Sequence, residues 1–152
     1  MLLSELLAPS RVRVPLKSQT KDELLRELVE LAAGERDAAA RAAILQAVRE
    51  REQLLSTGIG GGVAIPHGKT PQIDQLVMAA GVTARPVDFD ALDGAPVELC
   101  FLLIGPDSAA GAHVKALSRI SRLLRREPLR HGLRAARTPA EFLRVVRESE
   151  AA

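Results

Sequence analysis

The sequence holds three histidines, which are its clearest candidates for chemistry near neutral pH. His67 lies between Pro66, whose ring fixes its own φ, and Gly68, which has no Cβ to crowd an incoming group. An imidazole with a pKa near neutrality is a competent nucleophile toward phosphorus. The glycines just before it can point backbone N–H groups at an anion. Taken alone, this pattern is compatible with a phosphoryl acceptor, a metal ligand or a structural histidine.

The rest of the sequence argues against a metal site. A catalytic metal usually takes three protein ligands, and the other two histidines, His113 and His131, stand in no His-x-x-x-His or paired-Cys motif. Cys100 is the single cysteine, so an intrachain disulfide and a cysteine-rich metal site are both excluded. It stands in an apolar run, which predicts a buried filler. We therefore expect neither a metal nor another cofactor.

Charge and hydropathy restrict the partners. Lys and Arg number 21 against 19 Asp and Glu, which gives a net charge of +2. Arginines cluster between residues 119 and 137, where they form a solvated helix face or a docking surface for an acidic protein. No aromatic residue interleaves with them to stack on bases, so we expect no nucleic-acid partner. No apolar stretch approaches the roughly 20 residues of a membrane span, which predicts a cytoplasmic protein without membrane insertion.

Period-two alternation and apolar runs predict the strands. Pro15 should end the first of them, and the last should be central in the sheet. The segment 56–71 holds five glycines and two prolines, so it predicts a shaped loop rather than a regular element, apart from one short strand. The predicted strands span 11–16, 63–65, 76–87 and 97–104.

Helical periodicity predicts the elements between and after these strands. Capping boxes that begin at Thr20 and Thr138 mark two helix starts, and Gly34 marks a helix end. A short segment begins at Pro128. The predicted helices span 20–34, 37–52, 111–126 and 138–148. This order of elements predicts one α/β domain over residues 1–152, a sandwich in which helices cover both faces of a sheet.

The string from Arg51 to Lys69, Arg-Glu-Gln-Leu-Leu-Ser-Thr-Gly-Ile-Gly-Gly-Gly-Val-Ala-Ile-Pro-His-Gly-Lys, resembles the active-site segment of a known family. This family is enzyme IIA of the bacterial phosphotransferase system, in its fructose, mannitol and nitrogen-regulatory branch. The arginine, the Ser-Thr-Gly stretch and Pro-His-Gly occur in the order and spacing of the family. The resemblance extends to Asp88-Phe-Asp, to Gly111-Ala-His and to the C-terminal helix, so it covers nearly the whole chain.

The resemblance implies a mixed parallel and antiparallel sheet, and it implies roles for particular residues. His67 matches the histidine that takes a phosphoryl group from the phosphohistidine of the small carrier protein HPr or its nitrogen-branch counterpart. His113 matches a second histidine next to the first, and Arg51 matches an active-site arginine. Gly61 departs from the family, whose members commonly have asparagine at this position.

Physical chemistry suggests how the two supporting residues would act, and it leaves an alternative for each. A guanidinium at Arg51 can hold phosphate oxygens bidentately, whereas the alternative is a surface ion pair with Glu50 or Glu52. His113, near a helix start, can donate a hydrogen bond to phosphate, whereas the alternative is a half-buried histidine that caps its own helix. His131 matches no functional position and is expected on the surface.

Two purposes fit the family, and a third lies outside it. The Pro-His-Gly-Lys segment and the lack of an acceptor domain favour the nitrogen-regulatory branch, whose targets include potassium transporters and sensor kinases. The alternative is a sugar-specific, fructose- or mannitol-type enzyme IIA. The third possibility is a non-catalytic interaction module, against which His67, His113 and Arg51 argue. The expected partners are an HPr-type donor and, as acceptor, a regulatory target protein or a separate IIB protein.

Overall fold

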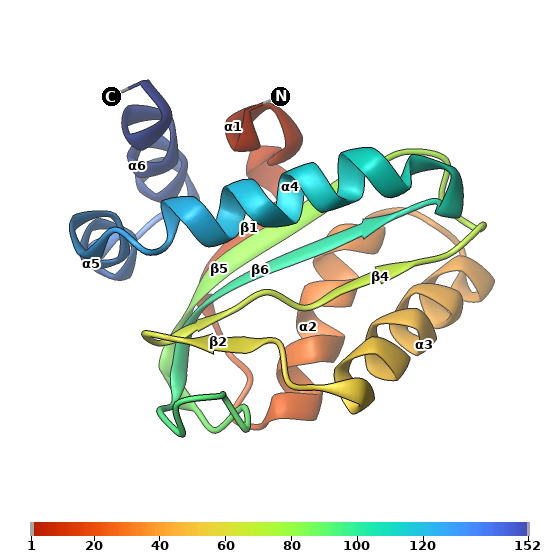
Figure 1. Cartoon of the computed structure of the whole chain (residues 1–152), viewed down its shortest axis with the longest axis horizontal. Helices are drawn as coiled ribbons and strands as arrows, with labels where there is room; N and C mark the ends of the chain where they lie inside the picture. Colours follow the sequence, from red (N-terminus) through yellow and green to blue (C-terminus); the bar gives the residue numbers. More distant parts are fainter. Residues whose placement is uncertain (1, 152) are drawn as a thin grey trace.

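Two long strands form the centre of the sheet (Figure 1). Strand β5 (Val77–Val87) pairs antiparallel with β6 (Val97–Gly105) along most of its length. Helices cover both faces of β6, so its residues are buried on both sides and only Glu98 is partly exposed. This double burial explains the nearly continuous apolar run in its sequence. The prediction that this run is central is confirmed.

Four shorter strands complete a mixed six-stranded sheet in the computed structural model, which describes residues 2–151. Strand β1 pairs parallel with β5, β3 and β4 both pair parallel with β6, and β2 pairs antiparallel with β3. The short strands are β1 (Val12–Leu16), β2 (Gly58–Gly60), β3 (Val63–Ala64) and β4 (His67–Lys69).

Helices lie on both faces of the sheet, so the predicted α/β sandwich with a mixed sheet is confirmed (Figure 1). Two helices pack one hydrophobic cluster against one face, and the other four helices pack a second cluster against the opposite face. The first pair is α2 (Lys21–Ala33) and α3 (Ala38–Leu54). The others are α1 (Leu3–Leu6), α4 (Ala110–Leu123), α5 (Glu127–Ala135) and α6 (Pro139–Ala151), with short 3-10 turns at Pro9–Arg11 and Asp107–Ala109.

Side-chain caps fix where three of these helices begin. The Thr20 hydroxyl accepts a hydrogen bond from the backbone N–H of Glu23 at the start of α2, and the Asp37 carboxylate caps α3 in the same way. Thr138 accepts from the backbone N–H of Glu141 at the start of α6. Each cap satisfies a helix N–H that has no partner within the helix. The two predicted capping boxes therefore mark real helix starts.

Three local predictions need correction. Pro15 does not end β1, because β1 is an edge strand and the missing N–H of a proline removes no ladder bond on the free side. The segment 56–71 is more regular than predicted, because it holds β2 and β4 in addition to the predicted short strand, which is β3. Helix α4 ends at Leu123, before the predicted end at residue 126, and α5 forms where only a short segment was expected.

Candidate functional site

His67 is the first residue of β4, and its imidazole is held by a backbone carbonyl. The Nδ1 atom lies 3.0 Å from the carbonyl oxygen of Ile65. Because a carbonyl oxygen only accepts, Nδ1 carries the proton in this contact and Nε2 keeps its lone pair. Pro66 lies between the two residues, and its fixed φ restricts how they move relative to each other. The residue as a whole is partly exposed.

Gly68 brings helix α3 close to β4. A Cβ at this position would lie 3.0 Å from the backbone carbon of Ala47 and from the backbone nitrogen of Val48. Only glycine allows the helix backbone to lie so near the strand. One turn further along α3, this approach carries Arg51 to the imidazole.

Arg51 faces the second nitrogen of His67. The Nε–H of Arg51 donates to Nε2 of His67 at 3.1 Å, while Nη1 donates to the Leu55 carbonyl at 2.9 Å. Within residues 2–151, Arg51 forms no ion pair with Glu50 or Glu52, so the alternative of a surface ion pair is wrong. The guanidinium therefore lies directly beside the atom with the free lone pair.

His113 lies in the first turn of α4, and its ring packs edge-on toward that of His67, with centroids 5.8 Å apart. It is buried, with 2% of its surface exposed, rather than half-buried. Neither ring nitrogen has a hydrogen-bond partner in the part of the chain that the structure describes, so the alternative of a helix-capping histidine is wrong. A buried, unpartnered imidazole is costly, and it suggests a partner that arrives with a ligand.

The surroundings keep both imidazoles neutral. Burial lowers the pKa of His113 to about 4, and the charge of Lys69, with that of His67 whenever its ring is protonated, acts in the same direction. Burial also lowers the pKa of His67, and the nearby charges of Arg51 and Lys69 act in the same direction. The Ile65 carbonyl and the Glu52 carboxylate oppose that shift. At neutral pH the site thus offers one nucleophilic nitrogen and one neutral N–H donor.

The remaining predicted positions lie away from this cluster. His131 is an exposed residue of α5 and contacts none of the three site residues through a hydrogen bond in residues 2–151. Gly61 has φ +66°, and its N–H donates to Oδ2 of Asp93. Asparagine tolerates this left-handed conformation better than most residues, so the glycine keeps the turn while it loses the amide. Cys100 is fully buried, as expected.

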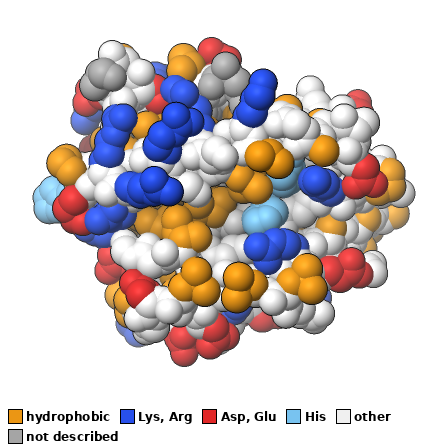
Figure 2. Space-filling model, viewed as in Figure 1, with side chains coloured by type: hydrophobic (Ala, Val, Ile, Leu, Met, Phe, Trp, Pro, Cys, Tyr) orange, Lys and Arg blue, Asp and Glu red, His pale blue; other side chains and the backbone are white. Residues whose placement is uncertain are grey.

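Two features of the site were not predicted from the sequence. Glu52, adjacent to Arg51, is buried rather than exposed. Leu54, Leu55 and Val114 are large apolar residues that follow the site residues in the chain, and they are 81%, 57% and 59% exposed. In Figure 2, hydrophobic and basic side chains border histidine side chains in the middle of one face. Among residues 2–151, no group of three or more His, Cys, Asp or Glu side chains is placed to hold a metal ion.

Comparison with known proteins identifies the family. The family described as "Phosphoenolpyruvate-dependent sugar phosphotransferase system, EIIA 2" matches residues 5–149 of the chain. The chain therefore belongs to this family of phosphotransferase-system IIA components. No helix among the described residues combines the length and the apolar character needed to cross a bilayer.

Particular relatives refine this likeness. The chain is 41% identical over 137 residues to a nitrogen regulatory protein of Bradyrhizobium diazoefficiens, with 90% of this chain and 89% of the relative covered. It is 33% identical to the fructose-specific EIIABC component of Bacillus subtilis, with coverage of 99% of this chain and 24% of that protein. The crystal structure of the nitrogen regulatory protein IIA-Ntr of Neisseria meningitidis superimposes with a TM-score of 0.88, at 32% identity, over 95% of this chain and 98% of that one.

Proposed function

We propose that the chain is a phosphocarrier whose His67 accepts a phosphoryl group on Nε2 from the phosphohistidine of an HPr-type carrier protein. The observation that carries this proposal is the pair of contacts on one ring. Nδ1 faces the Ile65 carbonyl at 3.0 Å, and Nε2 faces the Arg51 guanidinium at 3.1 Å. One nitrogen is thereby held as N–H, while the other keeps a lone pair beside a fixed positive charge.

The transfer balances within the two imidazoles. The Nε2 lone pair of His67 forms the new P–N bond while the P–N bond to the donor imidazole breaks. The donor ring, which carries a proton on its other nitrogen, keeps that electron pair and leaves as a neutral imidazole. The Nδ1 proton of His67 stays on its nitrogen throughout, so the step requires no separate acid or base. Arg51 releases Nε2 as phosphorus approaches, and its charge then faces the phosphoryl oxygens. Positive charge at that place stabilises the loose transition state of phosphoryl transfer.

His113 supplies the second contact to the phosphoryl group. The residue is 2% exposed and its ring nitrogens are unpartnered among residues 2–151, so it has an N–H available for a phosphoryl oxygen. A pKa of about 4 keeps this ring neutral at physiological pH. A neutral donor favours the phosphorylated state less strongly than a cation would, which suits a carrier that must also release the group.

The rim of the site favours a protein as the phosphoryl donor. Leu54 and Leu55 close the helix that carries Arg51, and Val114 follows His113 directly; all three expose apolar surface. Exposed apolar groups that gather around a polar site are typical of protein–protein interfaces. A small phosphorylated metabolite would need enclosing polar contacts instead.

The test is phosphorylation by a phosphorylated HPr-type carrier, followed by intact mass. We expect one acid-labile phosphoryl group on the wild-type chain and none on His67→Ala. His131→Ala, which changes an exposed histidine of α5, is the matched control and should be labelled like the wild type. His113→Ala should still be labelled, but more slowly. Full labelling of His67→Ala would exclude the proposal.

We further propose a regulatory role in nitrogen or potassium control, in which the phosphorylation state of His67 decides which target protein is bound. This role is supported by the 41% identity to a protein named as a nitrogen regulatory protein. A pull-down with His67→Ala and the charge-mimicking His67→Asp should recover different partner sets. Identical sets, together with phosphoryl transfer to a separate IIB protein, would instead favour a sugar-uptake role.

A further inference from the structure

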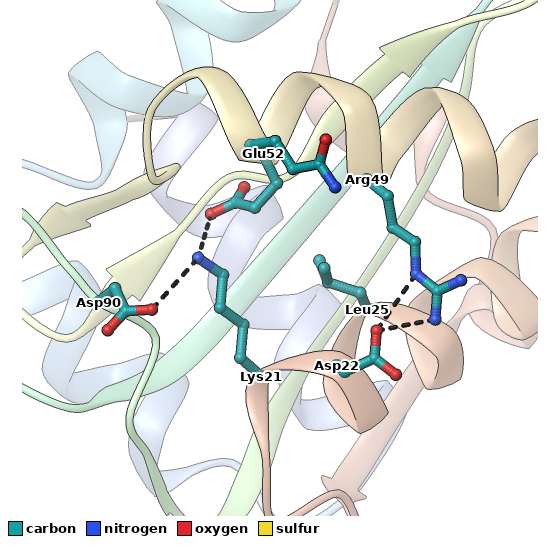
Figure 3. A pocket seen from close by; sticks show the side chains of 7 residues that line it. Lys21, Asp22, Leu25, Arg49, Glu52 and Asp90 are labelled. Carbon is teal, nitrogen blue, oxygen red and sulfur yellow. Dashed lines mark hydrogen bonds and ion pairs between the residues drawn. The ribbon is translucent and has the colours of Figure 1, made fainter.

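Glu52 is a buried charge directly next to Arg51 in α3. Only 7% of the residue is exposed, and both carboxylate oxygens have hydrogen-bond or ion-pair partners within the protein. It accepts hydrogen bonds from the backbone N–H of Thr57 at 2.9 Å and from the Thr57 hydroxyl at 2.5 Å. Lys21 reaches from the start of α2 to the same carboxylate, 2.9 Å away (Figure 3). A buried carboxylate needs such partners, and here they fix the position of Thr57.

The contacts continue from Thr57 to the imidazole. The Thr57 carbonyl accepts a hydrogen bond from the N–H of Ile65 at 2.9 Å, which extends the antiparallel pairing of β2 with β3 by one residue. The Ile65 carbonyl is the group that lies 3.0 Å from Nδ1 of His67. Three consecutive contacts therefore join the Glu52 carboxylate to the ring: Glu52 to Thr57, Thr57 to Ile65, and Ile65 to His67.

We propose that Glu52 is a positioning residue for phosphoryl transfer at His67, which acts through Thr57 and Ile65. It holds the imidazole as the Nδ1–H tautomer, so that Nε2 carries the lone pair and points toward the incoming phosphorus. This inference rests on the proposed function. Two successive residues of α3 then act on the two ring nitrogens of His67. Arg51 contacts Nε2 directly, and Glu52 acts through Thr57 to hold the Ile65 carbonyl, which is the partner of Nδ1.

The series of contacts from Glu52 to His67 is short, and backbone groups of Thr57 and Ile65 form most of it, which makes it stiff. The Ile65 carbonyl cannot shift without loss of the Thr57 contact, and Pro66 limits rotation between the carbonyl and the ring. Hydrogen bonds in a series polarise one another in a buried setting. A carboxylate at the far end strengthens the Thr57 N–H bond and orders the strand that carries the acceptor of Nδ1.

The competing explanation is that Glu52 only joins α2 to α3 through Lys21. Glu150 provides a matched control for this possibility. Its side chain is 2% exposed and it accepts from the backbone N–H groups of Leu3 and Ser4 and from the Arg119 guanidinium, but it lies on α6, against the opposite face of the sheet. Glu150→Gln thus removes an equally buried charge without touching the path to His67.

The first readout is the tautomer of His67, from long-range 1H–15N NMR of the unphosphorylated full chain. We expect one Nδ1–H pattern in the wild type and in Glu150→Gln, and a mixture with the Nε2–H form in Glu52→Gln. Thr57→Val removes only the hydroxyl contact and should shift the pattern in the same direction by less, whereas Thr57→Ser should restore it. These milder variants test the path if Glu52→Gln folds poorly. A wild-type tautomer pattern in both Glu52→Gln and Thr57→Val would overturn the proposal.

The second readout is the rate of phosphorylation by a phosphorylated HPr-type carrier. For Glu52→Gln we expect kcat to fall roughly tenfold or more, as displaced reacting groups do, with KM unchanged because the exposed docking residues are intact. An equal fall in Glu150→Gln, or an unchanged kcat in Glu52→Gln, would overturn the proposal. The proposed function fails separately, if the wild type itself accepts no phosphoryl group, and the tautomer measurement does not depend on that result.

Discussion

Acid should destabilise the fold through the His113 imidazole. Burial, with His67 and Lys69 nearby, lowers the pKa of this ring to about 4, against a value near 6.5 in an unfolded chain. Between these two pKa values the unfolded chain binds a proton that the folded chain does not bind. The free energy of unfolding therefore falls as the pH falls through this window. Each pH unit removes ~1.4 kcal/mol, so a drop to about pH 4.5 removes about 3 kcal/mol through this residue.

Urea unfolding at about pH 7 and about pH 4.5, in the wild type and in His113→Gln, measures this contribution. Circular dichroism is the appropriate probe, because the chain has no Trp or Tyr for fluorescence. The wild type should lose about 3 kcal/mol more than the variant on acidification. Carboxylates with lowered pKa values, such as Glu27 and Glu150, also lose stabilisation in acid, but they do so in both proteins. Equal acid losses in the two proteins would refute the argument that His113 is buried and neutral.

Two substitutions test the contact between α3 and the site, one through stability and one through the rate of phosphorylation. Gly68→Ala should lower the free energy of unfolding by about 1–3 kcal/mol, because the new Cβ lies 3.0 Å from the α3 backbone. Gly111→Ala, which lies in α4 and meets no atom within 4 Å, is the control and should leave the thermal unfolding temperature unchanged or slightly raised, because alanine favours a helix over glycine. Arg51→Lys keeps the charge but loses the Nε donor and the bidentate fork, so phosphorylation by the carrier should slow by roughly tenfold without being abolished. An unchanged rate would remove Arg51 from the reaction.

The partial exposure of His67 fits what its neighbours in the sequence favour, but those neighbours alone left its role open among a phosphoryl acceptor, a metal ligand and a structural histidine. Pro66 restricts the backbone just before His67, and Gly68 leaves space beside the His67 side chain. Both residues adjoin His67 in the sequence, so this effect can be recognised without a structure. The partnership with Arg51 is different, because it depends on how α3 packs on β4. Only the resemblance to a family indicated it, and the close backbone approach at Gly68 explains it afterwards.

The features that the sequence did not predict have physical reasons. Strands β2 and β4 are three residues long, too short for a period-two pattern to emerge from a glycine-rich segment. The four-residue α1 likewise shows no helical period. Glu52 stands among charged residues that predict exposure, and its burial depends on Thr57 and Lys21, which reach it from other elements.

The proposed function requires that one particular atom, Nε2 of His67, receives the phosphoryl group. After reaction with a phosphorylated HPr-type carrier, 1H–15N NMR of the phosphorylated chain identifies both the residue and the ring nitrogen. We expect phosphorus on Nε2 of His67, with the Nδ1 proton still directed at the Ile65 carbonyl. Phosphorus on Nδ1 of His67, or on any other residue, would contradict the geometry on which the proposed function is built.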